Sequence, residues 1–428
     1  AMHNISSFTE EDYMLAKKNY ISRVVYEPLE FKSFYGNREV RIFTRNWKDV
    51  DERFKNDEDF GEQLTMKNYF RRKLPTELLK IEGNLERAKA VYDFIQKNYT
   101  WNGRYFNYET KVKDNFDDKL GSVAAINLSL INALNAVGLN AKAVILSTRN
   151  NGLPTEIYPV LSNFNYVLAV LMINNERILL DATNKQSPFG IIPFPALNVQ
   201  GRVMDFKKGS YWMPIEPFKQ NIHFVNAQIT ADGNGDFSGK VSHVNYGYIG
   251  LGKRNTIDEE TVSEYIKTAQ KDKAGIEIEN YQVEDIHEIE KPLTESYDVT
   301  ITPETVGDKV ILFPFFNKTY ISENPFKMNE RSYPMDFGFP FTNTYVISID
   351  LGSMYGLEQL PKSRSIKLPN DDGECSVTYV SEGSKINIRF NMKLNQYRFP
   401  PDAYPSLKEF FGTMVTMLKD ESIVLKKI

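Results

Sequence analysis

The chain has 428 residues, and its 52 lysines and arginines against 56 aspartates and glutamates give a formal net charge of −4 at pH 7. Basic residues are spread among acidic ones, so the sequence shows no electrostatic footprint for nucleic-acid binding. No apolar run approaches the roughly 20 residues that a membrane-spanning helix needs. A chain of this length is expected to form two or three domains.

The first part of the chain is predicted to be mainly β-structure. Strand-like runs cover 20–26 and 39–43, and we interpret residues 1–45 as the tail of an N-terminal β-domain. The first residues do not form the basic and apolar leader of a signal peptide. A helix is expected over 47–64, and Asn84 is expected to cap the next one.

The segment that begins at Gly121 is the most informative part of the sequence. It predicts a buried apolar helix that Gly138 stops, because glycine favours the left-handed conformation of a helix C-cap. A strand-like run over 141–149 follows directly. Two further strands are predicted over 164–173 and 177–183.

This order of elements resembles the core of the transglutaminase-like, papain-related superfamily. In that superfamily a cysteine lies in the first turn of the helix, a histidine opens the first of the two later strands, and an aspartate ends the second. An alignment without gaps places Val123, Tyr166 and Asp181 at these three positions. The resemblance therefore implies a degenerate triad that keeps only its acidic member, although an aspartate before a turn can also cap backbone amides.

The sequence offers no replacement for the missing nucleophile and base. Cys375 is the only cysteine and lies in an acidic turn-to-strand segment. Ser122 follows the glycine turn and is interpreted as a helix N-cap. The four histidines lie outside the core helix and its two strands: His3, His223, His243 and His287. A conventional Cys–His or Ser–His hydrolase is therefore not expected.

Two segments imitate ligand-binding motifs. Residues 232–236 read like the start of a calcium loop, but Phe237 stands where that loop needs a glycine, so we predict a hairpin turn. The glycines of 247–252 do not follow the spacing of a dinucleotide-binding motif. No His, Cys, Asp or Glu cluster has zinc spacing. We therefore expect neither a metal nor a cofactor.

The second half of the chain is rich in alternating strands. We predict a core domain over 46–205, a β-rich domain over 206–330 with one helix near 259–271, and a C-terminal β-domain over 331–428 that ends in a helix. The expected fold class is α+β, with a transglutaminase-like (papain-related) core followed by antiparallel β-sandwich-type domains.

Several short motifs narrow the resemblance to a Bacteroidetes group of large envelope proteins with β-domains on both sides of a transglutaminase-like core. They are Asn127-Leu128-Ser129-Leu130-Ile131, Leu146-Ser147-Thr148-Arg149, Asn165-Tyr166-Val167, Leu180-Asp181-Ala182-Thr183, and Asn324-Pro325-Phe326-Lys327 followed by Arg331-Ser332-Tyr333-Pro334. The resemblance implies export to the periplasm or outer envelope. It implies no settled substrate.

Two functions remain open. The first is a non-catalytic binding or scaffold module, with an extended peptide, a glycan or an envelope protein in the former active-site groove. The candidate groove residues are Trp101, Asn127, Arg149, Asn165 and Tyr166, of which the two aromatic ones could instead pack between sheet and helix. The second is a protease- or transglutaminase-like hydrolase or acyltransferase that uses Asp181 and Tyr166. Because a tyrosine pKa is ordinarily about 10, this enzyme needs a large pKa shift, and we favour the first function.

Overall fold

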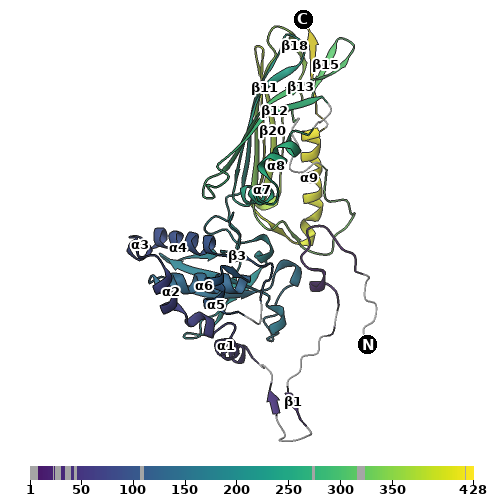
Figure 1. The fold of residues 1–428 in the computed structure, drawn as a ribbon. Coiled ribbons are helices and arrows are strands. Elements are labelled where there is room, and N and C mark those ends of the chain that lie inside the picture. Colours follow the sequence, from purple (N-terminus) through teal and green to yellow (C-terminus); the bar gives the residue numbers. More distant parts are fainter. Residues whose placement is uncertain are drawn as a thin grey trace. The chain divides into compact units, whose positions relative to one another are not determined.

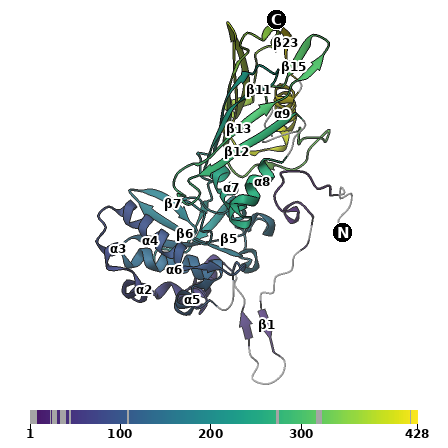
Figure 2. The same cartoon turned by 45° about the horizontal axis from the view of Figure 1, so that its top comes forward.

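The protein is represented by a computed structural model, which describes residues 8–22, 24, 30–33, 40–42, 46–106, 110–271, 275–315, 323–419 and 421–428. Contacts divide the chain into two compact units (Figures 1 and 2). Unit 1 comprises Ala1–Glu10 and Leu15–Pro217, and unit 2 comprises Glu11–Met14 and Phe218–Ile428. Within the described ranges, no helix is both long enough and apolar enough to cross a membrane.

The helices of unit 1 surround one central helix, α6 (Val123–Ala136), in which all residues but one are buried. A helix that is apolar on every side must be covered on every side. The others are α1 (Trp47–Lys55), α2 (Lys67–Lys73), α3 (Thr76–Lys80), α4 (Asn84–Asn98) and α5 (Val112–Asp118), with a 3-10 turn η2 (Glu62–Thr65). Helices α2, α4 and α5 pack against α6.

The main sheet of unit 1 has five antiparallel strands in the order β7-β6-β5-β8-β9, and α6 packs on β5 and β6. The strands are β5 (Asn140–Leu146), β6 (Tyr166–Ile173), β7 (Glu176–Leu180), β8 (Gln200–Val203) and β9 (Tyr211–Pro214). Two short pairs accompany this sheet: β3 (Thr100–Trp101) with β4 (Leu120–Gly121), and β1 (Glu30–Lys32) with β2 (Val40–Ile42).

Unit 2 is built on an eight-stranded sheet in the order β12-β13-β11-β10-β17-β21-β20-β19. Its strands are β10 (Ile222–Ala231), β11 (Phe237–Tyr246), β12 (Ile276–Glu284), β13 (Leu293–Ile301), β17 (Phe341–Asp350), β19 (Arg364–Lys367), β20 (Gly373–Glu382) and β21 (Lys385–Leu394). All neighbours are antiparallel except β10 and β17, which are parallel. The sheet has one buried and one polar face, because buried residues alternate along most strands.

A smaller sheet and three helices complete the core of unit 2. The smaller sheet has the order β14-β15-β23-β18, with β14 (Glu304–Val306), β15 (Lys309–Leu312), β18 (Tyr355–Gln359) and β23 (Ile423–Lys427). Helices α7 (Tyr248–Glu259) and α8 (Val262–Ala269) pack on β11–β13, while α9 (Tyr404–Lys419) packs on β19 and β20 (Figure 2). A two-stranded pair joins β16 (Met335–Asp336) to β22 (Arg398–Phe399).

The α+β class is confirmed, but the predicted domain boundary at residue 330 is not present in the structure. Residues 218–330 and 331–428 lie in one unit, because β10 from the first segment pairs along nearly its full length with β17 from the second. The contact boundary after unit 1 lies at Pro217, beyond the predicted residue 205. Strands β8 and β9 explain this position, since β9 pairs with β8 in the sheet of unit 1.

Several predicted elements have different limits in the structure. The helix expected over 47–64 ends at Lys55 with Asn56 as its C-cap, and Glu62–Thr65 form a separate 3-10 turn. The chain turns back between them, so closely that a side-chain carbon at Gly61 would meet the Lys55 carbonyl oxygen at 2.1 Å. Asn84 is the first residue of α4 and Gly83 is its N-cap. The helix expected near 259–271 is two helices, since Thr261 begins α8 with a capping box.

The N-terminal predictions are described only in part. Residues 20–22 and 24 of the expected strand over 20–26 are described and form no strand, while the other three lie outside the described residues. Val40–Ile42 from the expected 39–43 forms strand β2. The hairpin predicted at 232–236 is confirmed, because β10 and β11 pair up to the contact between Ala231 and Phe237.

Candidate functional site

The start of α6 is the position to which the sequence resemblance assigned a nucleophile. Ser122 is the N-cap, and its side-chain oxygen accepts a hydrogen bond from the Ala125 amide at 3.2 Å. This cap satisfies one of the amides that a helix start leaves without an intrahelical partner. Val123 is the first helical residue and is only 1% exposed.

Tyr166 and Asp181 lie together beside this helix. Tyr166 opens β6, and its hydroxyl donates to Oδ2 of Asp181 at 2.9 Å. Asn127 of α6 donates from Nδ2 to the same oxygen at 2.8 Å. The other oxygen, Oδ1, accepts from the amide of Thr183 at 2.9 Å and from the Thr183 hydroxyl. The carboxylate therefore links α6, β6 and the turn after β7.

The electrostatics of this group do not suit acid–base catalysis at neutral pH. Burial raises the pKa of Asp181, and the hydrogen bonds from Thr183, Asn127 and Tyr166 oppose this rise only in part. Burial and then the charge of Asp181 raise the pKa of Tyr166 well above its ordinary value. A tyrosine with so high a pKa cannot act as a general base at neutral pH.

The 101–106 loop closes the helix start. The amide of Val123 donates to the carbonyl of Arg104 at 3.0 Å, and the amide of Ala124 donates to the carbonyl of Tyr105 at 3.2 Å. The amides at the start of such a helix are those that would otherwise bind an oxyanion. In this structure carbonyl oxygens of the same chain occupy them.

Aromatic rings hold the 101–106 loop in this position. The Trp101 ring stacks on Tyr105 with a centroid distance of 6.0 Å and an interplanar angle of 7°. Tyr105 in turn contacts Tyr166 edge-to-face at 5.2 Å. The Trp101 indole also donates to the carbonyl of Arg104 at 2.8 Å. Tyr105 thus connects the start of α6 with the Tyr166–Asp181 pair.

The predicted groove residues do not line a common groove. Asn127 is fully buried and bonded to Asp181, and Tyr166 is 2% exposed. Arg149 is 8% exposed, donates to the Leu197 carbonyl and lies over the Phe194 ring. The side chain of Asn165 bonds both the amide and the hydroxyl of Thr148. Of the five, only Trp101 is exposed, because the other four satisfy contacts inside the protein.

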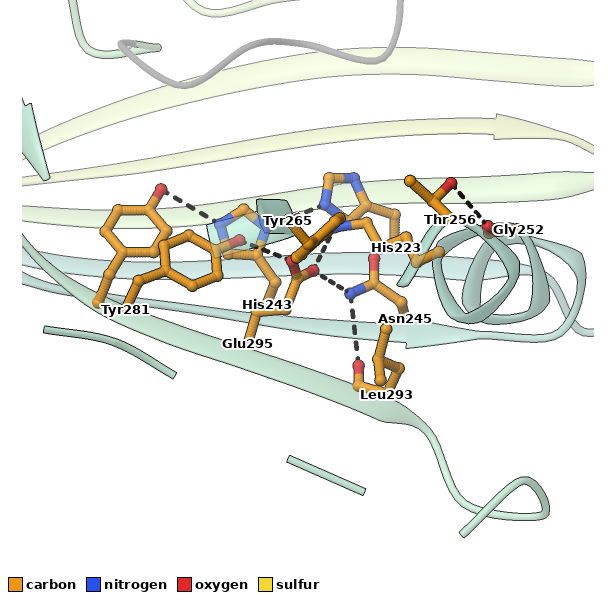
Figure 3. A network of polar contacts seen from close by, with 11 residues as sticks. His223, His243, Asn245, Gly252, Thr256, Tyr265, Tyr281, Leu293 and Glu295 are labelled. Carbon is orange, nitrogen blue, oxygen red and sulfur yellow. Dashed lines mark hydrogen bonds and ion pairs between the residues drawn. The ribbon is translucent and has the colours of Figure 1, made fainter. Parts of the chain in front are cut away.

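A second polar cluster, in unit 2, was missed by the sequence analysis (Figure 3). Its centre is Glu295 of β13, which is fully buried. Oε2 accepts from Lys253 of α7 and, at 2.9 Å, from Asn245 of β11. Oε1 accepts from the hydroxyls of Tyr265 in α8 and Tyr281 in β12, each at 2.6 Å. One carboxylate thereby joins both helices to three strands.

The positive charge of Lys253 affects the pKa values of both Glu295 and His223. Burial opposes the ionised form of Glu295, but Lys253 and the hydrogen bonds outweigh it and lower the pKa of the carboxyl to about 2. Beside it, Nε2 of His223 lies 3.1 Å from Nδ1 of His243. Burial first, and then the charge of Lys253, lower the pKa of His223 to about 4.

A strand pattern could have revealed the cluster. Leu293, Glu295 and Tyr297 alternate along β13 and all point to the buried face. A glutamate at an inward position between apolar residues requires a partner, because an unpaired buried charge is very costly. The partners on α7 and α8 could not be identified from this pattern, since they lie on other elements.

The structure is that of an α+β protein, and Val123 is the first residue of the central helix of unit 1. Residues 308–425 match the family described as "Domain of Unknown Function with solved-structure structure (DUF3858)", which lies within unit 2. No curated protein matches the chain.

Two solved structures are similar to this chain. One is a candidate protease from Parabacteroides distasonis ATCC 8503, with 12% identity and a TM-score of 0.50 over 95% of this chain and 64% of that one. The other is a candidate cysteine protease from Cytophaga hutchinsonii, with 14% identity and a TM-score of 0.24 over 39% and 52% of the two chains. At such low identity the first likeness shows the fold alone, and this chain spans 64% of that structure's length.

Proposed function

We propose that this protein is a non-catalytic, transglutaminase-like scaffold module of the cell envelope. The observation that carries the proposal is the occupation of the α6 start, where the amides of Val123 and Ala124 donate to carbonyls of the 101–106 loop. Acyl transfer needs a nucleophile and free donors for an oxyanion at that place. The envelope location rests on the resemblance of the sequence motifs.

The scaffold function is preferred over a binding groove because the former groove region is filled. Val123, Tyr166 and Asp181 are each no more than 2% exposed, and Tyr105 lies between the helix start and Tyr166. An extended peptide or a glycan could reach these residues only after the 101–106 loop moved away. The outer face of that loop, where Trp101 is 41% exposed, remains accessible to an envelope protein.

The alternative is a hydrolase or acyltransferase that uses Tyr166 and Asp181. The hydroxyl of Tyr166 is engaged as a donor to Asp181, and its raised pKa keeps it protonated. Such a group could serve as a nucleophile only after transferring its proton to Asp181, and burial together with the charge of Asp181 raises the pKa of Tyr166 too far for this transfer at neutral pH. The geometry therefore favours the non-catalytic function.

A direct test uses activated peptide esters and thioesters with the intact protein. We expect no covalent adduct on any residue between 101 and 183 in mass spectra of the digested protein. A stable acyl adduct on Tyr166, Asp181 or Ser122 would contradict the proposal, because it would show a working nucleophile.

A second test introduces a thiol at the start of α6. Val123→Cys and Tyr166→His are combined with Cys375→Ala, so that the protein holds one thiol, and iodoacetamide alkylation is followed over time. We expect slow alkylation because the 101–106 loop covers the site, and faster alkylation when Tyr105→Gly is added. Fast alkylation without the Tyr105 change would mean that the groove is open and would favour the binding function. Circular dichroism of each variant checks that the protein is folded.

A further inference from the structure

A short N-terminal segment, Glu11–Met14, belongs to unit 2 although the chain that follows it belongs to unit 1. In sequence it lies more than 200 residues from the rest of unit 2, which begins at Phe218. Its contacts are therefore those of a peptide that docks on a folded domain. They are made to residues between 326 and 337, with Tyr404 close to the same place.

The carboxylate of Glu11 is held in a built site. Oε1 accepts from the amide of Ser332 at 3.0 Å, and Oε2 accepts from the amide of Tyr333 at 3.2 Å. Nε of Arg331 lies 3.3 Å from Oε2, and the side chains of Glu11 and Arg331 are only 3% and 2% exposed. A buried carboxylate with a guanidinium and two amides is specific, because a neutral or shorter side chain would remove the negative charge that faces the buried guanidinium of Arg331.

Tyr13 makes the second anchor. Its ring centroid lies 4.6 Å from that of Phe337 and 5.8 Å from that of Phe326. Its carbonyl accepts from the amide of Asp336 at 2.8 Å. The pair of rings provides apolar contact with a preferred geometry, while the backbone bond fixes the direction of the segment.

The backbone of Glu11–Met14 has an unusual conformation at Tyr13. Tyr13 has φ +60°, a left-handed conformation that is rare and unfavourable for a bulky residue. Such a conformation persists only where surrounding contacts determine it. Here the Glu11 and Tyr13 anchors lie on both sides of Asp12, whose carbonyl accepts from Arg331. The segment has thus adopted the conformation that the site requires.

We propose that unit 2 carries a peptide-recognition site for a glutamate followed two residues later by an aromatic residue, and that Glu11–Met14 is its resident ligand. The partner that fits is a segment with this Glu-x-Tyr pattern, which competes with the resident segment for Arg331 and the rings of Phe326 and Phe337. The inference depends on contacts within unit 2 and not on whether the core site of unit 1 is catalytic.

The first experiment cuts the covalent link between the segment and the rest of the chain and asks whether the segment stays bound. A specific protease site is inserted after Val24, which is 62% exposed, and the cut protein is passed over a size-exclusion column. We expect the fragment of residues 1–24 to co-elute with the remainder. Release of the unaltered fragment on cutting would overturn the proposal.

Variants of the fragment identify the anchors. Glu11→Ala and Tyr13→Ala are expected to release the fragment, while Glu10→Ala, an exposed neighbour, is the matched control and should not. Asn19→Ala measures the separate attachment to unit 1, where Asn19 accepts from the Leu153 amide. Circular dichroism of each cut variant checks that unit 2 remains folded, because Glu11–Met14 is counted in that unit. Equal retention of the wild-type, Glu11→Ala and Tyr13→Ala fragments would overturn the proposal.

Competition tests the class of partner. A synthetic peptide of residues 8–16, added in excess to the cut protein, is expected to displace the fragment. The same peptide with Glu11→Gln is expected to displace it at least tenfold less well, about the effect of losing one charge-assisted hydrogen bond to a buried guanidinium. Equal displacement by both peptides would overturn the specificity for glutamate.

Discussion

Asp181 in unit 1 and Glu295 in unit 2 are both fully buried carboxylates that accept hydrogen bonds on both oxygens. Each joins helices to strands, and each has a tyrosine hydroxyl among its donors. They differ in one respect, because Lys253 contacts Glu295 whereas the donors to Asp181 are neutral side chains and one backbone amide.

That single cation reverses the effect of burial. Asp181 has no cation beside it among its described hydrogen-bond partners, and burial raises its pKa. Glu295 has Lys253 beside it, and its pKa is lowered to about 2. A buried carboxylate keeps its charge readily only where a cation shares the site. Tyr166 donates a hydrogen bond to Asp181 but carries no positive charge, so it cannot take the role that Lys253 has beside Glu295. The comparison therefore predicts different responses to mutation and to pH.

The largest effect is expected for Glu295→Gln. The change leaves the ammonium of Lys253 without its buried partner, and we expect unit 2 to lose about 3 kcal/mol in free energy of unfolding. Urea unfolding can be followed by hydrogen exchange of β11 and β13. All three tryptophans of the chain, Trp47, Trp101 and Trp212, lie in unit 1, so their fluorescence reports unit 1 separately.

Glu277→Gln is the matched control for this prediction, since Glu277 lies exposed on the neighbouring strand β12. It is expected to leave the stability of unit 2 within about 0.5 kcal/mol of the wild type. If the two substitutions changed the free energy of unfolding equally, the ion pair between Lys253 and Glu295 would not stabilise unit 2.

Acid is expected to destabilise unit 2 next most strongly. Unfolded His223 takes up a proton below its ordinary pKa of 6.5, whereas the folded residue does so only near 4. The unfolded state therefore binds more protons between these values, and stability falls as the pH drops from 6.5 to 4, by at most roughly 3 kcal/mol. Glu295 continues the loss below about pH 4.5.

Hydrogen exchange of β10 and β11 in urea, at several pH values between about 7 and 4, measures this slope. His223→Phe should flatten its upper part, because the phenyl ring does not titrate. A slope that is the same in wild type and variant would assign the acid response to other groups.

A smaller loss is expected for Tyr166→Phe in unit 1. The substitution removes one of the donors to Asp181 and leaves the other donors in place, which costs about 1–2 kcal/mol. Tryptophan fluorescence during urea unfolding gives the value. Tyr211→Phe on β9 is the control, because Tyr211 is 40% exposed. If Tyr166→Phe were neutral, the hydrogen bond to Asp181 would not support the fold.

The smallest effect, with the opposite dependence on pH, is expected for Asp181→Asn. The pKa of Asp181 is raised in the folded state, so the folded protein holds a proton that the unfolded protein has already lost. The contribution of Asp181 to the free energy of unfolding therefore falls as the pH rises. The uncharged asparagine lacks this dependence and strands no cation, so we expect a loss of less than about 1 kcal/mol at pH 7. A loss as large as that of Glu295→Gln would contradict the comparison.

Much of the fold could be predicted from local patterns. Gly121, Ser122 and Gly138 marked the limits of α6, because capping and left-handed glycine conformations are properties of a few adjacent residues. The alternation in β10 and β11, and the turn between them, were likewise local. The resemblance brought Tyr166 and Asp181 to notice, and the structure joins them by a hydrogen bond.

The candidate site was harder to predict, because its chemistry depends on which groups occupy the amides at the start of α6. The sequence placed Trp101 and Tyr166 near the helix start, but it gave no sign that carbonyls of Arg104 and Tyr105 accept from the α6 amides. Backbone hydrogen bonds of a loop carry no side-chain signature. Nor could the sequence show the hydrogen bonds of Asn127 and Arg149, two predicted groove residues, because their partners are backbone and buried groups.

By itself the sequence determined the order of helices and strands, the α+β class and the absence of a cysteine at the start of the central helix, because periodicity and capping act over a few residues. Only the tertiary structure decided that strands from both 218–330 and 331–428 share one eight-stranded sheet, that Glu295 meets Lys253, and that Glu11 docks on Arg331. These features depend on contacts between residues tens to hundreds of positions apart. Such contacts form because apolar faces must be covered and buried charges must be paired in the same folded structure.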